Sequence, residues 1–309
     1  MILCAGEALI DMLPRKTEGG ESAFAPYPGG SVFNTAVALA RLDQKVEFFT
    51  GLSKDLFGER LASVMMANGV GSKLAHRSDR PTTLAFVTLT DGQASYAFYD
   101  ENTAGRMLTP DDLPEIPADA EACFFGGISL AVEPCAEAYA ALADRATQSH
   151  VVMLDPNIRP GFILDEEVYR ARIDRMLAAS DIVKVSDEDL HWLMGDDTGL
   201  PKLAERMLDK GPALVLVTQG AEGVTGFYKG GEVHVAAERV EVVDTVGAGD
   251  TFNAGVLAGL AKAGALDKSM IRAGLTEATL SDAMTLGVKA AAVTVSRAGA
   301  NPPRTAELS

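Results

Sequence analysis

The chain has 309 residues, of which 47% are hydrophobic and 23% are charged, and its formal net charge is −16 at pH 7. This length and composition predict a globular protein with a sizeable core, arranged as one large domain or two medium ones. The negative charge excludes nucleic acid and an anionic membrane surface as partners, although a small phosphorylated ligand could still bind at a locally positive site.

The three cysteines, Cys4, Cys123 and Cys135, are widely spaced among apolar or small residues and form no Cys-x-x-Cys pair. This number and spacing of cysteines indicate buried thiols in a reducing compartment. The first residues show no basic segment followed by a cleavable apolar one, and no apolar run is long enough to span a bilayer. We therefore expect a cytoplasmic protein without a membrane partner.

Two apolar segments begin the chain. Residues 2–5 predict a short strand, and residues 8–10 predict a second one that ends at Asp11. A carboxylate at the C-terminal end of a strand in an α/β fold lies where ligands bind. A solvated turn residue is the alternative on position alone. Residues 14–28 are rich in Gly, Pro, Glu and Ser, which predicts a loop or a peripheral strand.

A glycine pair then precedes a predicted helix. Gly29 and Gly30 are followed by apolar residues at helical spacing up to residue 42, and Asn34 falls in the first turn. By its position alone, Asn34 is an ordinary polar helix residue.

The segments 82–89 and 94–100 alternate apolar and polar residues and are separated by Asp91-Gly92, which predicts a β-hairpin. Because the hairpin interrupts an alternation of strands and helices, we expect it to form a small sheet beside the main one. Phe98, near the end of the second strand, is interpreted as hairpin packing rather than as a ligand contact.

The alternation of strands and helices resumes at residue 122 and argues for a mainly parallel sheet with helices on both faces. The strand predicted over 151–155 is followed by Asn157 and Arg159, beyond the C-terminal end where ligands bind in such folds. An arginine there would stabilise the charge of a transferring phosphoryl group. A surface ion pair is the alternative.

Two further apolar strands follow. The first, at 182–185, leads into four polar residues at 186–189 that form a good helix-capping pattern. The second, at 213–218, is apolar almost throughout, as in a buried parallel sheet. Gly220 and Gly223 come after it in a Gly-x-x-Gly turn, which is a weak signal on its own.

The most informative stretch lies near residue 250. Val240, Val242 and Val243 predict the end of a strand, and apolar residues at helical spacing follow the nearly side-chain-free turn at 247–249. The first turn of a helix has unpaired backbone N–H groups that an anion could approach closely here. Asp250 would then be a carboxylate at an anion site, suited to take a proton from a hydroxyl that attacks a phosphoryl group. The alternative is that Asp250 merely caps the helix.

Residues 244–255, Asp-Thr-Val-Gly-Ala-Gly-Asp-Thr-Phe-Asn-Ala-Gly, resemble the C-terminal signature of the ribokinase-like (PfkB) carbohydrate kinases. Residues 28–42 resemble the N-terminal signature of that family, in which paired glycines and an asparagine contact the sugar. The segments 6–14 and 155–160 (Asp-Pro-Asn-Ile-Arg-Pro) look like those of bacterial fructokinases. The resemblance extends from residue 2 to about residue 303 and so covers nearly the whole chain.

The resemblance implies an α/β fold, a ribokinase-like three-layer sandwich with a mainly parallel central sheet and a small inserted β-sheet that acts as a lid. We expect a single kinase domain over residues 1–309, with lid segments at roughly 12–28 and 80–102. A lid sheet with apolar faces could also pair two copies into a homodimer.

The activity implied is that of an ATP-dependent sugar kinase, which transfers the γ-phosphoryl group to the primary hydroxyl of a sugar, with D-fructose as the first candidate. Relatives that act on 2-keto-3-deoxygluconate, ribose or nucleosides are the alternatives within the same architecture. A catalytically silent sugar- or nucleotide-binding module is an alternative of a different class, although it would have no need of Asp250.

The resemblance also assigns roles to individual residues. Asp250 would be the catalytic base, and the transferring phosphoryl group would be stabilised by Gly247, Ala248, Gly249 and Arg159. The sugar would be held by Asp11, Gly29, Gly30, Asn34, Asn157, Arg159 and Asp250. The nucleotide would contact Thr218, Gly220, Gly223, Gly247 and Gly249.

Two metal sites are implied as well. Mg²⁺ would bridge the nucleotide phosphates, and the family usually shows Asn-x-x-Glu where this chain has Ser186 and Asp189. The amide is therefore absent, and Asp189 would act on magnesium through water. Asp244 and the carbonyl of Val246, together with the loop at 296–301, would form a site for a monovalent cation such as K⁺.

Missing motifs argue against other classes of enzyme. The chain has no Gly-x-x-x-x-Gly-Lys-[Ser/Thr] loop, no Gly-x-Gly-x-x-Gly after the first strand and no Gly-x-Ser-x-Gly elbow. Its four histidines are scattered without metal-ligand spacing. A P-loop kinase and a dinucleotide oxidoreductase are therefore disfavoured.

Overall fold

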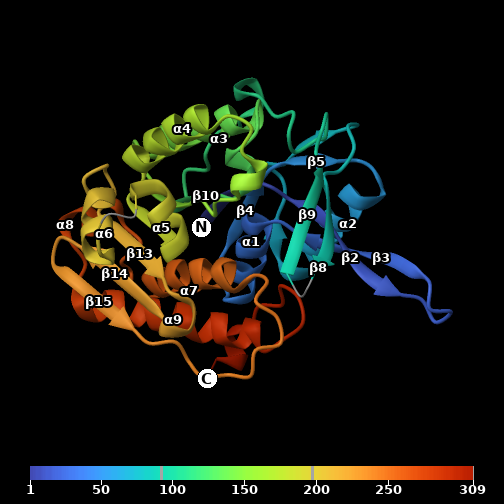
Figure 1. The fold of residues 1–309 in the computed structure, drawn as a ribbon. Helices are drawn as coiled ribbons and strands as arrows, with labels where there is room; N and C mark the ends of the chain where they lie inside the picture. Colours follow the sequence, from blue (N-terminus) through green and yellow to red (C-terminus); the bar gives the residue numbers. More distant parts are fainter. Residues whose placement is uncertain (91–92, 196–197, 309) are drawn as a thin grey trace.

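The computed structural model describes residues 1–90, 93–195 and 198–308. Over these residues, nine strands form one central sheet in the order β15-β14-β13-β12-β11-β10-β1-β4-β6 (Figure 1). The strands are β1 (Ile2–Ala5), β4 (Val46–Phe49), β6 (Val70–Gly71), β10 (Ala122–Gly126), β11 (Val151–Asp155), β12 (Ile182–Ser186), β13 (Leu214–Thr218), β14 (Val224–Tyr228) and β15 (Gly231–Val235).

The sheet is parallel from β6 to β13, and the pairs β13–β14 and β14–β15 at one edge are antiparallel. Its central strands β1, β10 and β11 are buried at every position. This explains why they are continuous apolar runs, since a parallel sheet has both faces covered. The mainly parallel sheet is therefore confirmed.

Helices cover both faces of the sheet. Alternate residues of β1 belong to two separate apolar clusters, with Ile2 and Cys4 in one and Leu3 and Ala5 in the other, because successive strand residues point to opposite faces. The first cluster packs against α1 (Ser31–Arg41), α2 (Leu56–Asn68), α7 (Ala248–Lys262), α8 (Lys268–Ala273) and α9 (Glu277–Val295). The second packs against α3 (Cys135–Ala146), α4 (Glu166–Ala179), α5 (Asp187–Met194) and α6 (Leu200–Leu208). Figure 1 shows α3 and α4 above the sheet and α7 and α9 below it, so the three-layer sandwich is confirmed.

The expected second sheet lies at one side of this sandwich (Figure 1). Its strand order is β3-β2-β8-β9, with β2 (Leu9–Lys16), β3 (Ser22–Gly29), β8 (Leu84–Thr90) and β9 (Gln93–Tyr99). The predicted hairpin is the antiparallel pair β8–β9, whereas its predicted turn, Asp91-Gly92, lies outside the described residues. A further pair, β5 (Gly51–Ser53) and β7 (His76–Ser78), is parallel.

Two sequence predictions were wrong. The strand that begins at Leu9 does not end at Asp11 but continues to Lys16, because β3 pairs with it antiparallel along its whole length. Residues 240–243 form no strand. Val242 and Val243 are 62% and 58% exposed, and the backbone N–H of Val243 donates to the carbonyl of Val295 at the end of α9. A β-branched run becomes a strand only where another strand is available to pair with it.

Short 3₁₀ helices complete the fold: η1 (Pro110–Asp112), η2 (Ile128–Leu130), η3 (Pro160–Phe162), η4 (Gly220–Glu222) and η5 (Thr305–Glu307). All three cysteines are buried as free thiols, as predicted. Over the described ranges, none of the helices combines the length and the apolar character needed to cross a membrane.

Candidate active site

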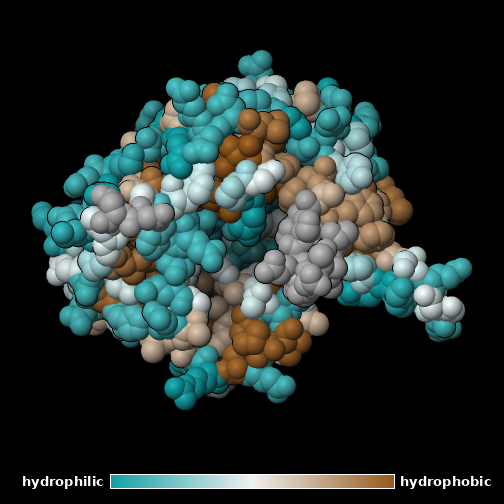
Figure 2. Space-filling model, viewed as in Figure 1, coloured by the Kyte–Doolittle hydropathy of each residue, from teal (hydrophilic) through white to brown (hydrophobic). Residues whose placement is uncertain are grey.

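A cavity of about 290 Å³ lies at the carboxyl ends of β11 and β12, between the small sheet and the N-terminus of α7. Figure 2 shows a hollow with hydrophilic residues near the centre of the face drawn. The cavity wall combines two sequence-predicted segments far apart in the chain, 30–34 and 245–250, with Asn157 and Arg159. This edge of a parallel α/β sheet is where ligands bind.

The N-terminus of α7 opens onto the cavity. The helix begins at Ala248 after Gly247, whose φ of 79° suits glycine, and no side chain caps its first N–H groups. Asp250 therefore does not cap the helix, which removes the plainest alternative for this residue. The uncapped N–H groups and the positive end of the helix dipole form an anion-binding surface.

The Asp250 side chain is held in place from the other side of the cavity. Its Oδ2 accepts a hydrogen bond of 2.9 Å from Nδ2 of Asn34, and its backbone oxygen accepts one of 3.2 Å from the Thr35 hydroxyl. Both partners lie on α1, some 215 residues earlier in the chain. Asn34 is thus no ordinary helix residue but the group that orients Asp250.

The surroundings of Asp250 shift the pKa of its carboxyl towards neutral pH. Burial raises its pKa from 3.8 to about 7, the hydrogen bond from Asn34 opposes this rise, and Asp155 adds to it. Only 8% of the residue is exposed. A carboxylate with a pKa near the working pH is well matched to proton transfer.

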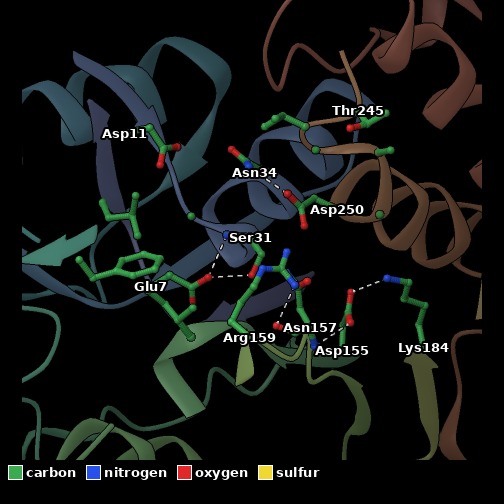
Figure 3. A pocket seen from close by; sticks show the side chains of 18 residues that line it. Glu7, Asp11, Ser31, Asn34, Asp155, Asn157, Arg159, Lys184, Thr245 and Asp250 are labelled. Atoms are coloured by element: carbon green, nitrogen blue, oxygen red, sulfur yellow. Dashed lines mark hydrogen bonds and ion pairs between the residues drawn. The ribbon is translucent and has the colours of Figure 1, made fainter. Parts of the chain in front are cut away.

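Asp11 and Gly30 line the small-sheet side of the cavity, Gly29 ends β3 beside them, and Figure 3 shows Asp11, Asn34 and Asp250 around one space. A Cβ at Gly29 would collide with the Asp11 carboxylate, so this glycine leaves room for that side chain. Burial, and then the charge of Glu7, raises the pKa of Asp11 to about 6.

Asn157 and Arg159 follow β11 at the cavity rim. Asn157 has a φ of 44°, unusual for a residue with a side chain, and its N–H donates to Oδ1 of Asp155 at 3.2 Å. Nη1 of Arg159 donates to the backbone oxygen of Ile158 at 2.9 Å. Within the described ranges Arg159 forms no salt bridge, which argues against the surface ion pair considered above.

Sequence reasoning missed the charged group beneath this rim. Lys184 on β12 is 5% exposed, and its ammonium lies 3.0 Å from Oδ2 of Asp155, which also accepts a 2.7 Å hydrogen bond from Asn253 (Figure 3). The ammonium lies 3.0 Å from where a Cβ at Gly249 would be. Burial lowers the pKa of Lys184, but Asp155 and the other nearby carboxylates outweigh it and raise the pKa, so the amine stays charged. The sequence signal that could have identified Lys184 is a lysine within an otherwise apolar strand.

Asp189 lies in the first turn of α5, close to this lysine, but does not line the cavity. Its backbone N–H donates to Oγ of Ser186 at 3.0 Å, which confirms the capping pattern. Burial and then Asp155 raise the pKa of Asp189, whereas Lys184 lowers it. Among the residues that the structure describes, no group of three or more His, Cys, Asp or Glu side chains could hold a metal ion.

The remaining predicted residues lie outside the cavity wall or at its margin. Thr218 ends β13, and the turn that follows has Gly220 and Gly223 at φ 54° and 108°, values that favour glycine. The Asp244 carboxylate accepts the N–H of Val246 at 3.0 Å and that of Gly299 at 2.9 Å, so it joins the two loops expected to flank a monovalent cation.

Comparison with known proteins identifies the family of this chain and several relatives. The model described as pfkB family carbohydrate kinase matches residues 1–307. A fructokinase from Rhizobium leguminosarum bv. trifolii is 55% identical over 273 residues, which cover 88% of this chain and 83% of that protein.

Two solved structures extend the similarity to the fold. A fructokinase from Xylella fastidiosa with bound ATP has a TM-score of 0.89 and 30% identity, with 99% of this chain and 96% of that chain covered. A fructokinase from Vibrio cholerae O395 with fructose, ADP and a potassium ion bound has a TM-score of 0.87 and 26% identity, with the same coverage of 99% and 96%.

Proposed function

The chain belongs to the pfkB family of carbohydrate kinases, and from this premise we propose that it transfers the γ-phosphoryl group of ATP to the primary hydroxyl of D-fructose. The observation that carries the proposal is the placement of a buried carboxylate of raised pKa, Asp250, beside an uncapped helix N-terminus in one cavity. A phosphoryl-transfer site needs these two features together, a base for the attacking hydroxyl and donors for the phosphoryl oxygens.

In the proposed reaction, Asp250 accepts the proton of the sugar hydroxyl as its oxygen attacks the γ-phosphorus. The new oxygen–phosphorus bond forms while the bond from that phosphorus to the ADP oxygen breaks. The N–H groups of residues 247–250 take up the charge of the transferring group, and the ammonium of Lys184 adds positive charge behind Gly249. Arg159 acts from the sugar side.

The charges around the cavity support a neutral sugar over a sugar acid. Asp11 and Asp250 face the region where Asn34 and Gly30 would hold the sugar, and Glu7 adds a third carboxylate to the cavity wall. An anionic substrate such as 2-keto-3-deoxygluconate would meet three carboxylates there, which is unfavourable. A neutral polyol can instead donate its hydroxyl hydrogens to the same oxygens. These arguments favour fructose over the acid.

We further propose that ATP lies along Thr218, Gly220 and Gly223 towards Gly247 and Gly249, with Mg²⁺ neutralising charge on its phosphates. The oxygen of Asp189 is a ligand type that magnesium accepts, and because Asp189 does not line the cavity, we propose contact through water. For K⁺, the candidate ligands are Asp244 and the carbonyl of Val246. The N–H groups that already occupy the Asp244 oxygens make this the weaker site.

The lid and a homodimer are proposals as well. We interpret residues 1–309 as a single domain in which the small sheet covers the sugar. Phe24, Tyr27 and Tyr99 on that sheet are 43%, 42% and 63% exposed, and these aromatic surfaces would be buried if the sheets of two copies paired. Light scattering of the purified chain would give the molecular mass in solution, and a strictly monomeric species would contradict the homodimer.

One experiment tests the activity. Release of ADP from ATP is measured with a panel of sugars, and the sugars are ranked by kcat/KM. We expect fructose to rank first and 2-keto-3-deoxygluconate to rank at least tenfold lower. Another sugar tenfold above fructose would refute the substrate assignment. Sugar binding without sugar-dependent ADP release would instead support the silent binding module.

A further inference from the structure

Glu7 lies in the turn between β1 and β2, in the wall of the cavity, and is 9% exposed. Its Oε1 accepts two hydrogen bonds from Ser31, 2.9 Å from the backbone N–H and 2.7 Å from the hydroxyl (Figure 3). Its Oε2 faces the backbone N–H of Ser129 at 3.4 Å. The carboxylate is therefore directed at the first residue of α1.

Helix α1 has no cap of its own. The residue before it is Gly30, with a φ of 108° and no side chain, and no acidic residue is present in its first turn. A helix start in this condition leaves N–H groups without partners and a positive dipole end without a counter-charge. The Glu7 carboxylate, which comes from a different element, supplies both the acceptor and the negative charge.

Two glycines make room for this carboxylate. A Cβ at Gly30 would lie 2.8 Å from the backbone oxygen of Glu7, and a Cβ at Gly127, whose φ is 73°, would overlap the carboxylate oxygens. On the other side, the Tyr139 hydroxyl donates to the backbone oxygen of Gly6 at 3.0 Å. The side chain is thus held by Ser31 and Ser129, and the backbone before it is fixed by Tyr139, which is an arrangement for precise placement rather than for solvation.

The helix that Glu7 caps carries the groups that hold Asp250. Asn34 and Thr35 lie about one turn after Ser31, and both donate to Asp250, through its carboxylate and its backbone oxygen respectively. A shift or fraying of the first turn of α1 would move these donors away from the base. A displacement of about 1 Å at a reacting group can reduce a rate on the order of a hundredfold.

We propose that Glu7 is a positioning residue for phosphoryl transfer, which caps α1 from outside the helix and thereby determines where Asn34 holds Asp250. The inference rests on the proposed function for its kinetic effect, but its structural effect on α1 does not depend on any substrate. Glu7 does not contact the reacting atoms in this role. Its charge acts on Asp250 together with those of Asp155 and Lys184.

The kinetic test compares Glu7→Ala and Glu7→Gln with Glu47→Gln, which removes the same charge from β4, outside the cavity. Glu7→Ala should lower kcat on the order of ten- to a hundredfold and leave KM for ATP within about twofold. Glu7→Gln keeps an acceptor for Ser31 but removes a like charge near Asp250. The acidic limb of its kcat/KM profile should therefore move to lower pH by about half a unit. A kcat for folded Glu7→Ala within about twofold of the values for wild type and Glu47→Gln would overturn the proposal.

A double mutant separates positioning from direct contact with the sugar. If Glu7 acts through α1, adding Glu7→Ala to Asn34→Ala should lower kcat by less than about a further twofold, because the coupled step is already lost. Fully additive losses would show that Glu7 acts independently of Asn34, and the proposal would be wrong.

Amide hydrogen exchange provides a readout without any substrate. Glu7→Ala should speed exchange in the peptide that spans residues 30–36 on the order of tenfold, as loss of a helix cap does, while the core strands remain protected. If Glu7→Ala does not fold, Ser31→Ala, which removes only the hydroxyl donor, should give a smaller increase. Unchanged exchange at 30–36 in a folded variant would overturn the inference. An absence of sugar turnover in the wild type would overturn only the proposed function.

Discussion

Replacement of Asp250 by asparagine should make the enzyme slower and at the same time more stable. The substituted side chain has nearly the same shape, and its oxygen can still accept the 2.9 Å hydrogen bond from Asn34, so the fold should be retained. The variant cannot take the proton of the sugar hydroxyl. Loss of a positioned general base costs on the order of 10²–10⁴ in rate, which is about 3–5 kcal/mol of barrier.

The gain in stability follows from the same burial that makes Asp250 a base. Its pKa is raised from 3.8 to about 7 in the folded chain, so the folded state holds a proton that the unfolded state releases at lower pH. Folding stability therefore falls as pH rises from about 4 to 7, and the loss is complete above the folded pKa. At 1.36 kcal/mol per unit, this shift corresponds to about 4 kcal/mol, which the neutral asparagine would not lose.

Two measurements on each protein test this reasoning: kcat by ADP release, and the midpoint of thermal unfolding at pH 5 and pH 8. We expect Asp250→Asn to unfold roughly 5 °C higher than the wild type at pH 8, with a smaller difference at pH 5. Asp282→Asn, on the exposed side of α9, is the matched control and should change neither quantity. Near-normal turnover of a folded Asp250→Asn enzyme would refute the role as base. A lower midpoint at pH 8 would refute the electrostatic argument.

The other predictions concern the pH profile, the sugar pocket and the far side of the sheet. Since the base must be ionised, kcat/KM should rise with pH through about 7, the pKa of Asp250, and level off above it; a profile flat from pH 5.5 to 8 would contradict this. Gly29→Ala should raise KM for the sugar about tenfold or more and leave KM for ATP within about twofold, because the added Cβ would displace Asp11. An equal rise of KM for the sugar and for ATP would show that the substitution does not act through Asp11. Asp181 is fully buried, and its carboxylate lies 2.6 Å from the Lys268 ammonium at the end of the sheet opposite the cavity. Asp181→Ala should lower the free energy of unfolding by about 3–5 kcal/mol and leave kcat of the folded fraction unchanged. Urea unfolding measures this loss, and a loss below about 1 kcal/mol would show that the ion pair adds little.

These predictions share one physical basis, the removal of water around charged groups. Asp250, Asp155 and Lys184 are each less than 10% exposed, and all three line the cavity. In such surroundings charges interact more strongly than in water, so small changes of position alter both pKa and rate. A site of this kind reduces stability in order to keep its groups reactive.

Much of the fold and part of the site could be predicted because the relevant signals are local. Continuous apolar runs such as 122–126 and 151–155 identified buried parallel strands, and the alternation at 82–100 identified a hairpin. The turn at 247–249 followed by Asp250 identified an anion site because glycine spacing and a helix start are properties of neighbouring residues.

Apart from the end of β2, which depends on its neighbour β3, the errors and omissions concern partners distant in the chain. The run at 240–243 has the composition of a strand, but it lies beyond the edge strand β15, where no further strand pairs with it. Lys184 was recognised as part of a strand but not as a charged group of the site, since its partner Asp155 is 29 residues away. Glu7 was not identified as a site residue, since its partner Ser31 is 24 residues away.

The amino-acid sequence alone determined which segments become strands and helices, and it placed a carboxylate beside a glycine-rich helix start, because hydrophobic periodicity and backbone freedom act over a few residues. Only the tertiary structure decided that Asn34 meets Asp250 across 216 positions, and that Glu7 and Lys184 face the same cavity. Burial and mutual electrostatic interaction set the protonation of these groups, and both arise only when the chain brings distant segments together.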